Sequence, residues 1–224
     1  MRPIYKFIEY KYLSSFFETG SLRLGTVYNF KDTDKHGKHR GDSNEGKHNV
    51  ARKIDGPLTV RSGENHPIIS EFFKIGGEGS VTLQNISLVM PRISPDYFVF
   101  CTSHVYTEVL FNKWMENEDG IDSCYEIFNP HGFSNAISKA ISSSAYYSFA
   151  SDVIYTDEDI DYRQNLNPAI TKRRNYDWQK EHRMLWSPLL PSPPLQPWNI
   201  NVPEARKFCR PVAHFFENKV ILKL

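Results

Sequence analysis

Residues 3–28, PIYKFIEYKYLSSFFETGSLRLGTVY, decide the fold, because they predict a strand, a helix and a second strand in immediate succession. Residues 3–7 predict the first strand. The apolar side chains that follow recur at the spacing of one face of an amphipathic helix, namely Tyr12, Leu13, Phe16 and Phe17. Gly20 stands where a glycine commonly ends a helix, and residues 22–28 begin with the apolar–polar alternation of a strand.

Strands predominate in the remainder of the chain. Short runs of strand-like composition predict further strands at residues 57–61, 68–75, 80–90, 97–103, 121–128, 152–156 and 181–186. One helix is predicted over residues 106–116, and another follows Asn129 and Pro130, which form a favourable N-cap and first-turn pair. Residues 212–216 and 219–224 predict a closing hairpin.

The helices and strands do not alternate regularly, so the chain predicts a single α+β domain over residues 1–224 with a mostly antiparallel, split sheet and a few flanking helices. Residues 31–56 lack a periodic apolar pattern and predict a long polar loop, and loops of this length in compact domains are usually functional or disordered. Residues 187–203 hold six of the 14 prolines and predict an extended surface segment.

Composition limits the classes of protein to consider. The chain has 224 residues with 27 Lys+Arg against 26 Asp+Glu, which argues against a nucleic-acid coat over the whole surface. The charge is segregated, because residues 31–53 and residues 170–183 each carry a net +3. No window approaches the roughly 18 apolar residues of a spanning helix, and the three cysteines form no CxxC pair. We therefore expect a cytoplasmic protein without a membrane partner.

The predicted polar loop contains the first candidate constellation, Arg40, Asp42, Glu45 and Gly46. An arginine beside a glycine can approach a phosphate closely and bind it through two hydrogen bonds. Alternatively, Asp42 and Asn44 are turn residues and Arg40 pairs with Glu45. Both interpretations are compatible with the sequence.

The second constellation runs from Lys172 into the predicted strand at residues 181–186 and includes Trp178, Glu181 and Arg183. Residues two apart on a strand share a face, so Glu181 and Arg183 point the same way. A carboxylate at a sheet edge beside aromatic residues fits a functional site. The alternative is a structural ion pair of Glu181 with Arg183 or with Lys172. The density of aromatic and charged residues favours a site.

Three other chemistries have weaker patterns. His36, His39 and His48 recur among acidic residues, but strong zinc sites have tighter spacing, with cysteines or an HExxH helix, so we predict no metal. Glu45-Gly-Lys47 has the ExK form of metal-dependent nucleases, yet it lies among glycines. The glycine cluster at residues 76–79 lacks the lysine and helix of a P-loop and predicts a hairpin turn.

Several different short motifs follow one another through most of the chain. Their residues, in order, are Tyr5-Lys6-Phe7, Gly20, Leu22, Leu24, Arg40, Asp42, Glu45, Gly46, Cys101, Ser103, Trp114, Gly120, Val153, Tyr155, Lys172, Trp178, Glu181 and Arg183. This order resembles a widespread bacterial family of domains of unknown function, often encoded on mobile elements or near phage-defence genes. The family often has His-Tyr shortly after the central tryptophan, whereas this chain has Met115, Glu116 and Asn117.

The strand–helix–strand opening and the late glutamate on a strand are also distantly similar to ADP-ribosyltransferases, including those that modify DNA. The similarity implies a split sheet whose cleft holds NAD. Tyr5 or Lys6 would lie beside the nicotinamide, and Tyr28 would stack on its ring. Arg40 would contact the diphosphate. Glu181 would hold the ribose hydroxyl and stabilise the oxocarbenium-like transition state. The other residues assigned to NAD binding are Asp42, Glu45, Lys172, Trp178 and Arg183.

The leading hypothesis is an NAD-dependent ADP-ribosyltransferase, a toxin or anti-phage effector with a nucleic-acid or protein acceptor and a neutralising or partner protein. The alternative is a non-catalytic sensor that binds nucleic acid or a phage component through Arg40, Lys172, Arg173 and Arg174. A metal-dependent nuclease ranks third and would require Mg²⁺-dependent cleavage that is lost when Asp42 or Glu45 is changed to alanine.

Overall fold

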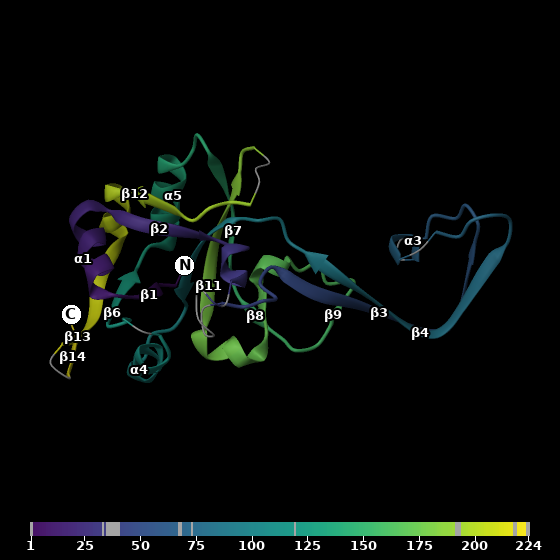
Figure 1. Ribbon diagram of the computed structural model, residues 1–224, viewed down its shortest axis with the longest axis horizontal. Coiled ribbons are helices and arrows are strands. Elements are labelled where there is room, and N and C mark those ends of the chain that lie inside the picture. Colours follow the sequence, from purple (N-terminus) through teal and green to yellow (C-terminus); the bar gives the residue numbers. More distant parts are fainter. Residues whose placement is uncertain are drawn as a thin grey trace.

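A mostly antiparallel sheet forms the centre of the molecule in the computed structural model, which describes residues 2–32, 34, 41–66, 69–72, 74–118, 120–190, 194–216 and 219–222 (Figure 1). The strand order is β12–β2–β5–β1–β6–β13–β14, and β11 pairs with β5 and β7. These strands are β1 (Ile4–Ile8), β2 (Ser21–Thr26), β5 (Phe98–Ser103), β6 (Ser123–Ile127), β7 (Ala145–Asp152), β11 (Glu181–Pro188), β12 (Trp198–Asn201), β13 (Cys209–Phe216) and β14 (Lys219–Leu222). The predicted combination of helices with a mostly antiparallel sheet is confirmed.

The opening of the chain folds as its pattern predicts, with α1 (Tyr10–Thr19) between β1 and β2. Leu13 and Phe16 are the buried residues of α1. Gly20 ends the helix at φ +80°, and its N–H donates to the Phe16 carbonyl at 2.8 Å. A Cβ on this glycine would lie 2.4 Å from the backbone nitrogen of Pro203, so both the turn and the packing require glycine here.

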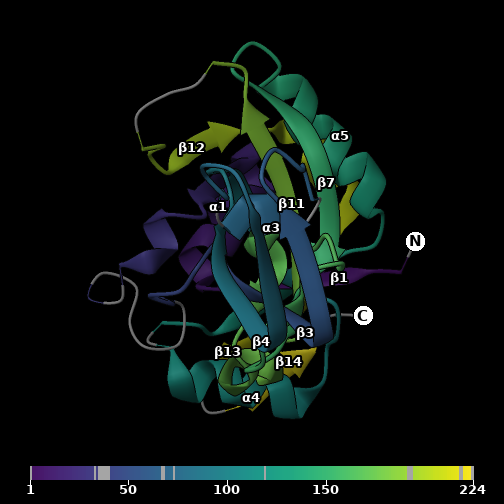
Figure 2. The same ribbon diagram turned by 90° about the vertical axis from the view of Figure 1, so that its right-hand side faces the viewer.

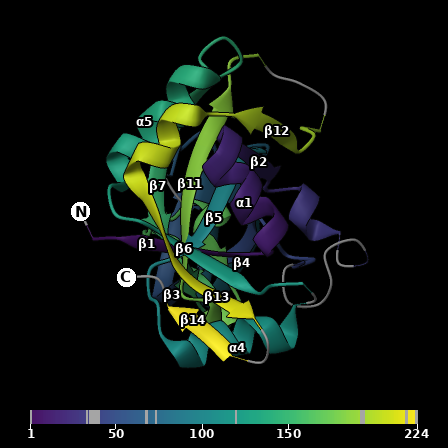
Figure 3. The ribbon, with the colours of Figure 1, turned by 90° about the vertical axis from the view of Figure 1, so that its left-hand side faces the viewer.

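Helices cover both faces of the sheet. Figure 3 shows α1 and α5 (Pro130–Ala140) together in front of β5 and β11, and their apolar side chains share one core cluster with these strands. On the other face α4 (Glu108–Asn117) packs its Leu110 and Phe111 with Phe7 of β1. The predicted cap of α5 is confirmed, because the Asn129 side chain accepts the Gly132 N–H at 3.0 Å.

The sheet is split beside β5. One edge of β5 pairs with β11 from Phe98 to Ser103. The opposite edge pairs with β2 only at Phe98 and Val99, and with β1 only at Ser103. In the strand registers of the described residues, Phe100–Thr102 therefore has no partner strand on this edge. β1 and β2 diverge here and leave an opening between them.

A long hairpin, called the arm below, projects away from the sheet (Figures 1 and 2). It consists of β3 (Lys47–Arg61) and β4 (Ser80–Ile93), which pair antiparallel along their lengths. The prediction of a polar loop over residues 31–56 is wrong from Lys47 onward. The less exposed face of β3 carries Val50 and Ile54, but Arg52 stands between them and interrupts the apolar alternation that would predict a strand. Residues 33 and 35–40 of that loop lie outside the described residues.

Two other local predictions are corrected. Residues 69–72 of the predicted strand at 68–75 form the one-turn helix α3 (Ile69–Phe72), whose first N–H is accepted by the His66 ring at 3.2 Å. The proline-rich stretch 187–203 is not wholly an extended surface segment, because β12 extends the sheet by pairing with β2. Proline-poor residues 198–201 keep the N–H groups that an edge strand needs.

Short elements complete the chain around the end of β11: η1 (Asn29–Lys31), β8 (Ile154–Tyr155), β9 (Ile160–Asp161), η2 (Pro168–Ile170), β10 (Thr171–Lys172), η3 (Arg174–Gln179) and η4 (Pro203–Phe208). β8 pairs in parallel with β10, and β9 pairs in parallel with β3 at the base of the arm. The predicted tail hairpin is present as β13 and β14.

Candidate functional site

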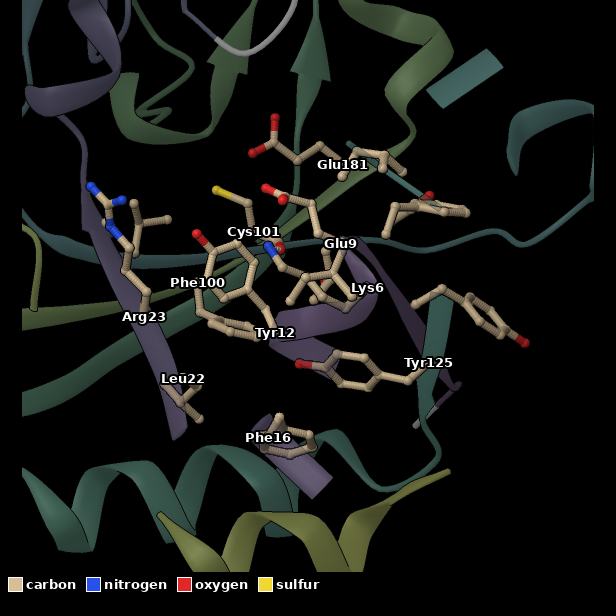
Figure 4. A pocket seen from close by; sticks show the side chains of 18 of the residues that line it. Lys6, Glu9, Tyr12, Phe16, Leu22, Arg23, Phe100, Cys101, Tyr125 and Glu181 are labelled. Atoms are coloured by element: carbon tan, nitrogen blue, oxygen red, sulfur yellow. Dashed lines mark hydrogen bonds between the residues drawn. The ribbon is translucent and has the colours of Figure 1, made fainter. Parts of the chain in front are cut away.

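A cavity of about 560 Å³ lies in the split between β1 and β2. Aromatic side chains from the flanking elements form much of its wall, including those of Phe7, Phe16, Phe30, Phe100, Trp114 and Tyr125. Charged and polar side chains also line it, among them Lys6, Glu9, Arg23, Cys101, Lys172, Gln179, Glu181 and Arg183. In Figure 4, Lys6, Cys101 and Glu181 lie near one another, and Arg23 reaches in from β2. The cavity is thus largely apolar with converging polar groups, the usual character of a small-molecule site.

Four charged side chains, here called the charge network, are buried at one end of this cavity: Glu45, Lys172, Glu181 and Arg183. The Arg183 guanidinium donates through Nε to Glu181 Oε1 at 2.8 Å and through Nη2 to Glu45 Oε2 at 2.9 Å. Lys172 Nζ lies 2.8 Å from Glu181 Oε2 and 3.9 Å from Glu45 Oε2. The two carboxylates and two cations balance each other, which is how buried charges are tolerated.

β11 places Glu181 and Arg183 on the same side, as the alternation predicts. Leu185 continues that face into a core cluster with Val99, whereas Met184 and Trp186 face α1 and α5. The backbone N–H of Glu181 donates to the Tyr155 hydroxyl at 2.8 Å, and its carbonyl accepts the Val153 N–H.

A tight turn brings Glu45 to Arg183 from a distant part of the chain. The Asp42 side chain accepts the Asn44 N–H at 2.9 Å, and its carbonyl accepts the Glu45 N–H at 2.8 Å. The structure agrees with the alternative interpretation in which Asp42 and Asn44 are turn residues, whereas the pairing of Arg40 with Glu45 that belongs to it lies outside the described residues. Both Glu45 oxygens accept hydrogen bonds from Arg183, so among the described residues Arg183 is the hydrogen-bonded ion partner of Glu45, and Lys172 is a second, more distant one.

The charge network sets the protonation state of Glu181. Burial alone would raise the pKa of its carboxyl group, but the charges of Arg183 and Lys172 and the hydrogen bonds they donate outweigh burial and hold this pKa well below its usual range. Burial would likewise lower the pKa of Lys172, yet the Glu181 charge opposes this effect and the pKa is raised. Glu181 is therefore an ionised carboxylate at the cavity wall.

Lys6 and Tyr5 also line the cavity. Lys6 Nζ donates to the Cys101 carbonyl at 2.8 Å, on the β5 edge that the split leaves without a partner strand, and lies 5.0 Å from the centroid of the Phe100 ring. The Tyr5 hydroxyl donates to Glu126 Oε1 at 3.5 Å. Burial, followed by the nearby Glu181 charge, raises the pKa of the Cys101 thiol to about 12, so this sulfur is a neutral thiol.

Four of the assigned residues that the structure describes do not line the cavity: Tyr28, Asp42, Glu45 and Trp178. The Tyr28 hydroxyl donates to the Ser94 carbonyl at 2.6 Å, and Lys31 covers its ring. Trp178 packs on Trp114 with ring centroids 4.8 Å apart. The Asp42 side chain accepts a hydrogen bond within the turn described above. All four side chains are held by internal contacts, Glu45 by the hydrogen bonds it accepts from Arg183, so the structure does not join them to the cavity. Arg40, the predicted diphosphate ligand, lies outside the described residues.

Two further residues of the cavity wall, Arg23 and Gln179, were not among the site residues predicted from the sequence. Gln179 Oε1 accepts a hydrogen bond from Lys172 Nζ at 3.2 Å and so belongs beside the charge network. The alternation of Leu22 and Leu24 around Arg23 predicts that Arg23 lies on the opposite face of β2 from the core. No pattern in the sequence indicates that this face borders a cavity.

Among the described residues, no three His, Cys, Asp or Glu side chains are grouped so that they could hold a metal ion. Of the helices that the structure describes, none has the length and apolar character to cross a membrane. Two of the three histidines of the His36, His39 and His48 run lie outside the described residues, and the ring Nδ1 of His48 lies 3.0 Å from Thr171 Oγ1.

Comparisons of the chain with family models, with curated protein sequences and with solved structures found no match. The function therefore has to be argued from the cavity and its residues.

Proposed function

We propose that the cavity in the split binds NAD and that Glu181 promotes cleavage of the bond between the ribose and the nicotinamide, as in an ADP-ribosyltransferase. The observation that carries this proposal is the placement of an ionised, buried carboxylate in the wall of a largely apolar cavity that several aromatic side chains line. A volume of about 560 Å³ lies within the usual range for ligand sites. The aromatic side chains provide apolar surface for the nicotinamide and adenine rings.

The chemistry needs a carboxylate at this place. When the N-glycosidic bond breaks, nicotinamide leaves with the bonding electron pair, and positive charge develops on the ribose as in glycoside hydrolysis. The acceptor then supplies a new electron pair to the ribose carbon and loses a proton. An ionised Glu181 would accept a hydrogen bond from a ribose hydroxyl and stabilise the positive charge more in the transition state than in the bound substrate. Either a nucleic acid or a protein fits the role of acceptor.

The ion pairs of Glu181 support this role and do not compete with it. Arg183 and Lys172 hold both oxygens of the carboxylate in fixed positions, at 2.8 Å for the shortest contact of each cation. A group that is already oriented needs no reorganisation when the charge develops. Glu45 balances the charge of Arg183, so Glu181 stays ionised next to two cations without an excess of positive charge.

The test is to incubate the full chain with NAD and measure nicotinamide release by chromatography. Glu181→Gln keeps the shape of the side chain and is expected to bind NAD while turnover falls about 10²- to 10³-fold, the usual loss for one preorganised electrostatic group. Glu158→Gln, which changes an exposed glutamate outside the cavity, is the matched control and keeps wild-type turnover. Absence of nicotinamide release from the wild type, or equal turnover in both variants, would refute the proposal.

A second candidate, a non-catalytic nucleic-acid-binding protein, is favoured by one observation on the arm. Its two strands carry five basic residues against one acidic residue, namely Lys47, Arg52, Lys53, Arg61 and Arg92 against Asp55. A two-stranded ribbon fits the major groove of DNA. Lys172, assigned to this function from the sequence, is buried in the charge network and does not serve it. Arg173 and Arg174 are exposed.

Fluorescence anisotropy of labelled duplex DNA at two salt concentrations separates the candidates. Binding that weakens steeply with salt, is lost in the Lys47→Gln/Lys53→Gln double variant and occurs without nicotinamide release would favour the second candidate. Nicotinamide release that depends on Glu181, with no DNA binding, would favour the first.

A further inference from the structure

Arg23 is a charged residue of the cavity wall that neither the charge network nor the core uses. It lies on β2 between Leu22 and Leu24, which are buried in the core cluster beneath α1 and α5. Side chains alternate along a strand, so Arg23 lies on the opposite face of the sheet. Gly25 lies on the same face of β2 as Arg23 and pairs with Val99 of β5. Val99 in turn lies on the same face of β5 as Cys101.

The same register carries this face to the charge network. Cys101 of β5 pairs with Arg183 of β11, and Ser103 pairs with Glu181. Directly paired residues lie on the same face of a sheet, so Arg23, Arg183 and Glu181 share one face across the split. Figure 4 agrees, because it shows the Arg23 side chain rising from β2 toward the level of Glu181 and Cys101.

Arg23 is exposed, and no hydrogen bond or ion pair of its guanidinium occurs within the described part of the chain. By contrast, Arg183 donates to two carboxylates and Arg163 is paired with Asp161. An arginine that lines a cavity without an internal partner keeps its whole fork of N–H donors for a ligand.

The remaining charges of the wall are suited to an anion. Glu9, the other acidic residue of the wall, is paired with Lys11 at 2.5 Å, and Glu181 is balanced within the charge network. Lys6 adds a second positive charge from the β1 side of the same cavity. The cavity therefore presents net positive charge on both sides of the split.

We propose that Arg23 binds a phosphate group of the ligand, so that the cavity selects phosphorylated nucleotides over nucleosides. The planar guanidinium fork matches two phosphate oxygens, which gives a bidentate, charge-assisted contact. This proposal rests on the proposed function in one respect, because the diphosphate of NAD is the group that Arg23 would hold. It does not depend on whether the glycosidic bond is cleaved.

The test measures binding of ADP and of adenosine to the full chain by isothermal titration calorimetry. The wild type is expected to bind ADP more tightly than adenosine. Arg23→Gln is expected to weaken ADP binding by about 10- to 100-fold, the usual effect of losing a hydrogen-bonded charge, and to leave adenosine binding unchanged. Arg163→Gln removes an exposed arginine outside the cavity and serves as the matched control with wild-type affinity for both probes.

Three outcomes would overturn the assignment of Arg23. They are unchanged ADP affinity in Arg23→Gln, an equal loss for ADP and adenosine, and a wild type that binds ADP no more tightly than adenosine. Arg23 is exposed and not part of the core, so circular dichroism of Arg23→Gln should match the wild type. Nicotinamide release is measured on the same preparations. Selective ADP binding without release would refute the catalytic proposal alone, and release without selective ADP binding would refute only the role of Arg23.

Discussion

Replacing Arg183 by methionine should destabilise the protein more than any surface substitution, because Arg183 holds the charge network together. Its guanidinium donates to both oxygens of Glu45, to both oxygens of Glu181 and to the Ala169 carbonyl. Methionine fills similar volume and donates no hydrogen bond. Two buried carboxylates would then share Lys172, whose Nζ lies 2.8 Å from Glu181 but 3.9 Å from Glu45.

The magnitude follows from the burial of the stranded group. The Glu45 side chain is 0% exposed, so water cannot replace the lost guanidinium. Removing one partner of a buried pair costs about 3–5 kcal/mol, a large part of the roughly 5–15 kcal/mol by which a domain is stable. With a denaturant slope of roughly 2–3 kcal/mol per M, the urea midpoint should fall by about 1–3 M.

Equilibrium urea unfolding followed by tryptophan fluorescence measures this shift. Arg163→Met is the control, since Arg163 pairs with Asp161 at the exposed surface and its loss should leave the midpoint at the wild-type value. The double variant Glu45→Gln/Arg183→Met should lose less free energy of unfolding than the two single variants together, because it leaves one carboxylate without Arg183 instead of two. A midpoint of Arg183→Met close to that of the wild type would refute the view that the network is a coupled, buried unit.

Three further outcomes are expected. The pKa of Glu181 is lower in the folded than in the unfolded protein, so its contribution to stability is present above the unfolded value of about 4.3 and is lost as the pH falls below that value. The urea midpoint should therefore fall less between pH 6 and pH 3 in Glu181→Gln than in the wild type. Parallel curves would contradict this. Gly20→Ala should lower the urea midpoint more than Gly56→Ala does. Both glycines have a positive φ, but only Gly20 has backbone atoms within 3 Å of the new Cβ. Equal shifts would show that the contact with Pro203 does not destabilise the protein. Cys101, with a thiol pKa of about 12, should react with iodoacetamide at pH 8 far more slowly in the folded than in the urea-unfolded chain. Peptide mass spectrometry measures the two rates. Similar rates would indicate that Cys101 is a thiolate in the folded protein.

The sequence predicts those parts of the fold whose residues bury one face. The apolar spacing in α1 and the alternation around Leu22 and Leu24 are consequences of packing on a core, so the opening strand–helix–strand could be identified from the residues alone. The same alternation predicts that Glu181 and Arg183 share a face. The two suggested ion partners of Glu181, Arg183 and Lys172, are both present.

The parts that escaped prediction are those that a local pattern does not determine. The first half of β3 was not predicted because Arg52 lies between Val50 and Ile54 on the less exposed face of the strand and interrupts the apolar alternation. Glu45 lies 138 residues from Arg183, and its partner is decided by the turn at Asp42 and by the position of β11. Arg23 reaches the cavity only because β1 and β2 diverge along β5, which is a property of the sheet as a whole.

Glu181 was open to two interpretations, a structural ion pair and a functional carboxylate, and the geometry makes them parts of one arrangement. A carboxylate in the wall of a largely apolar cavity stays ionised only if cations accompany it. Those cations reduce the field that Glu181 exerts at a distance, since the charge network is neutral as a whole. Glu181 would therefore act on a ligand mainly through direct contact with its oxygens, which makes the position of the ribose decisive. An anchor elsewhere on the ligand is then needed to set that position, and a phosphate held by Arg23 on the far side of the split would provide it.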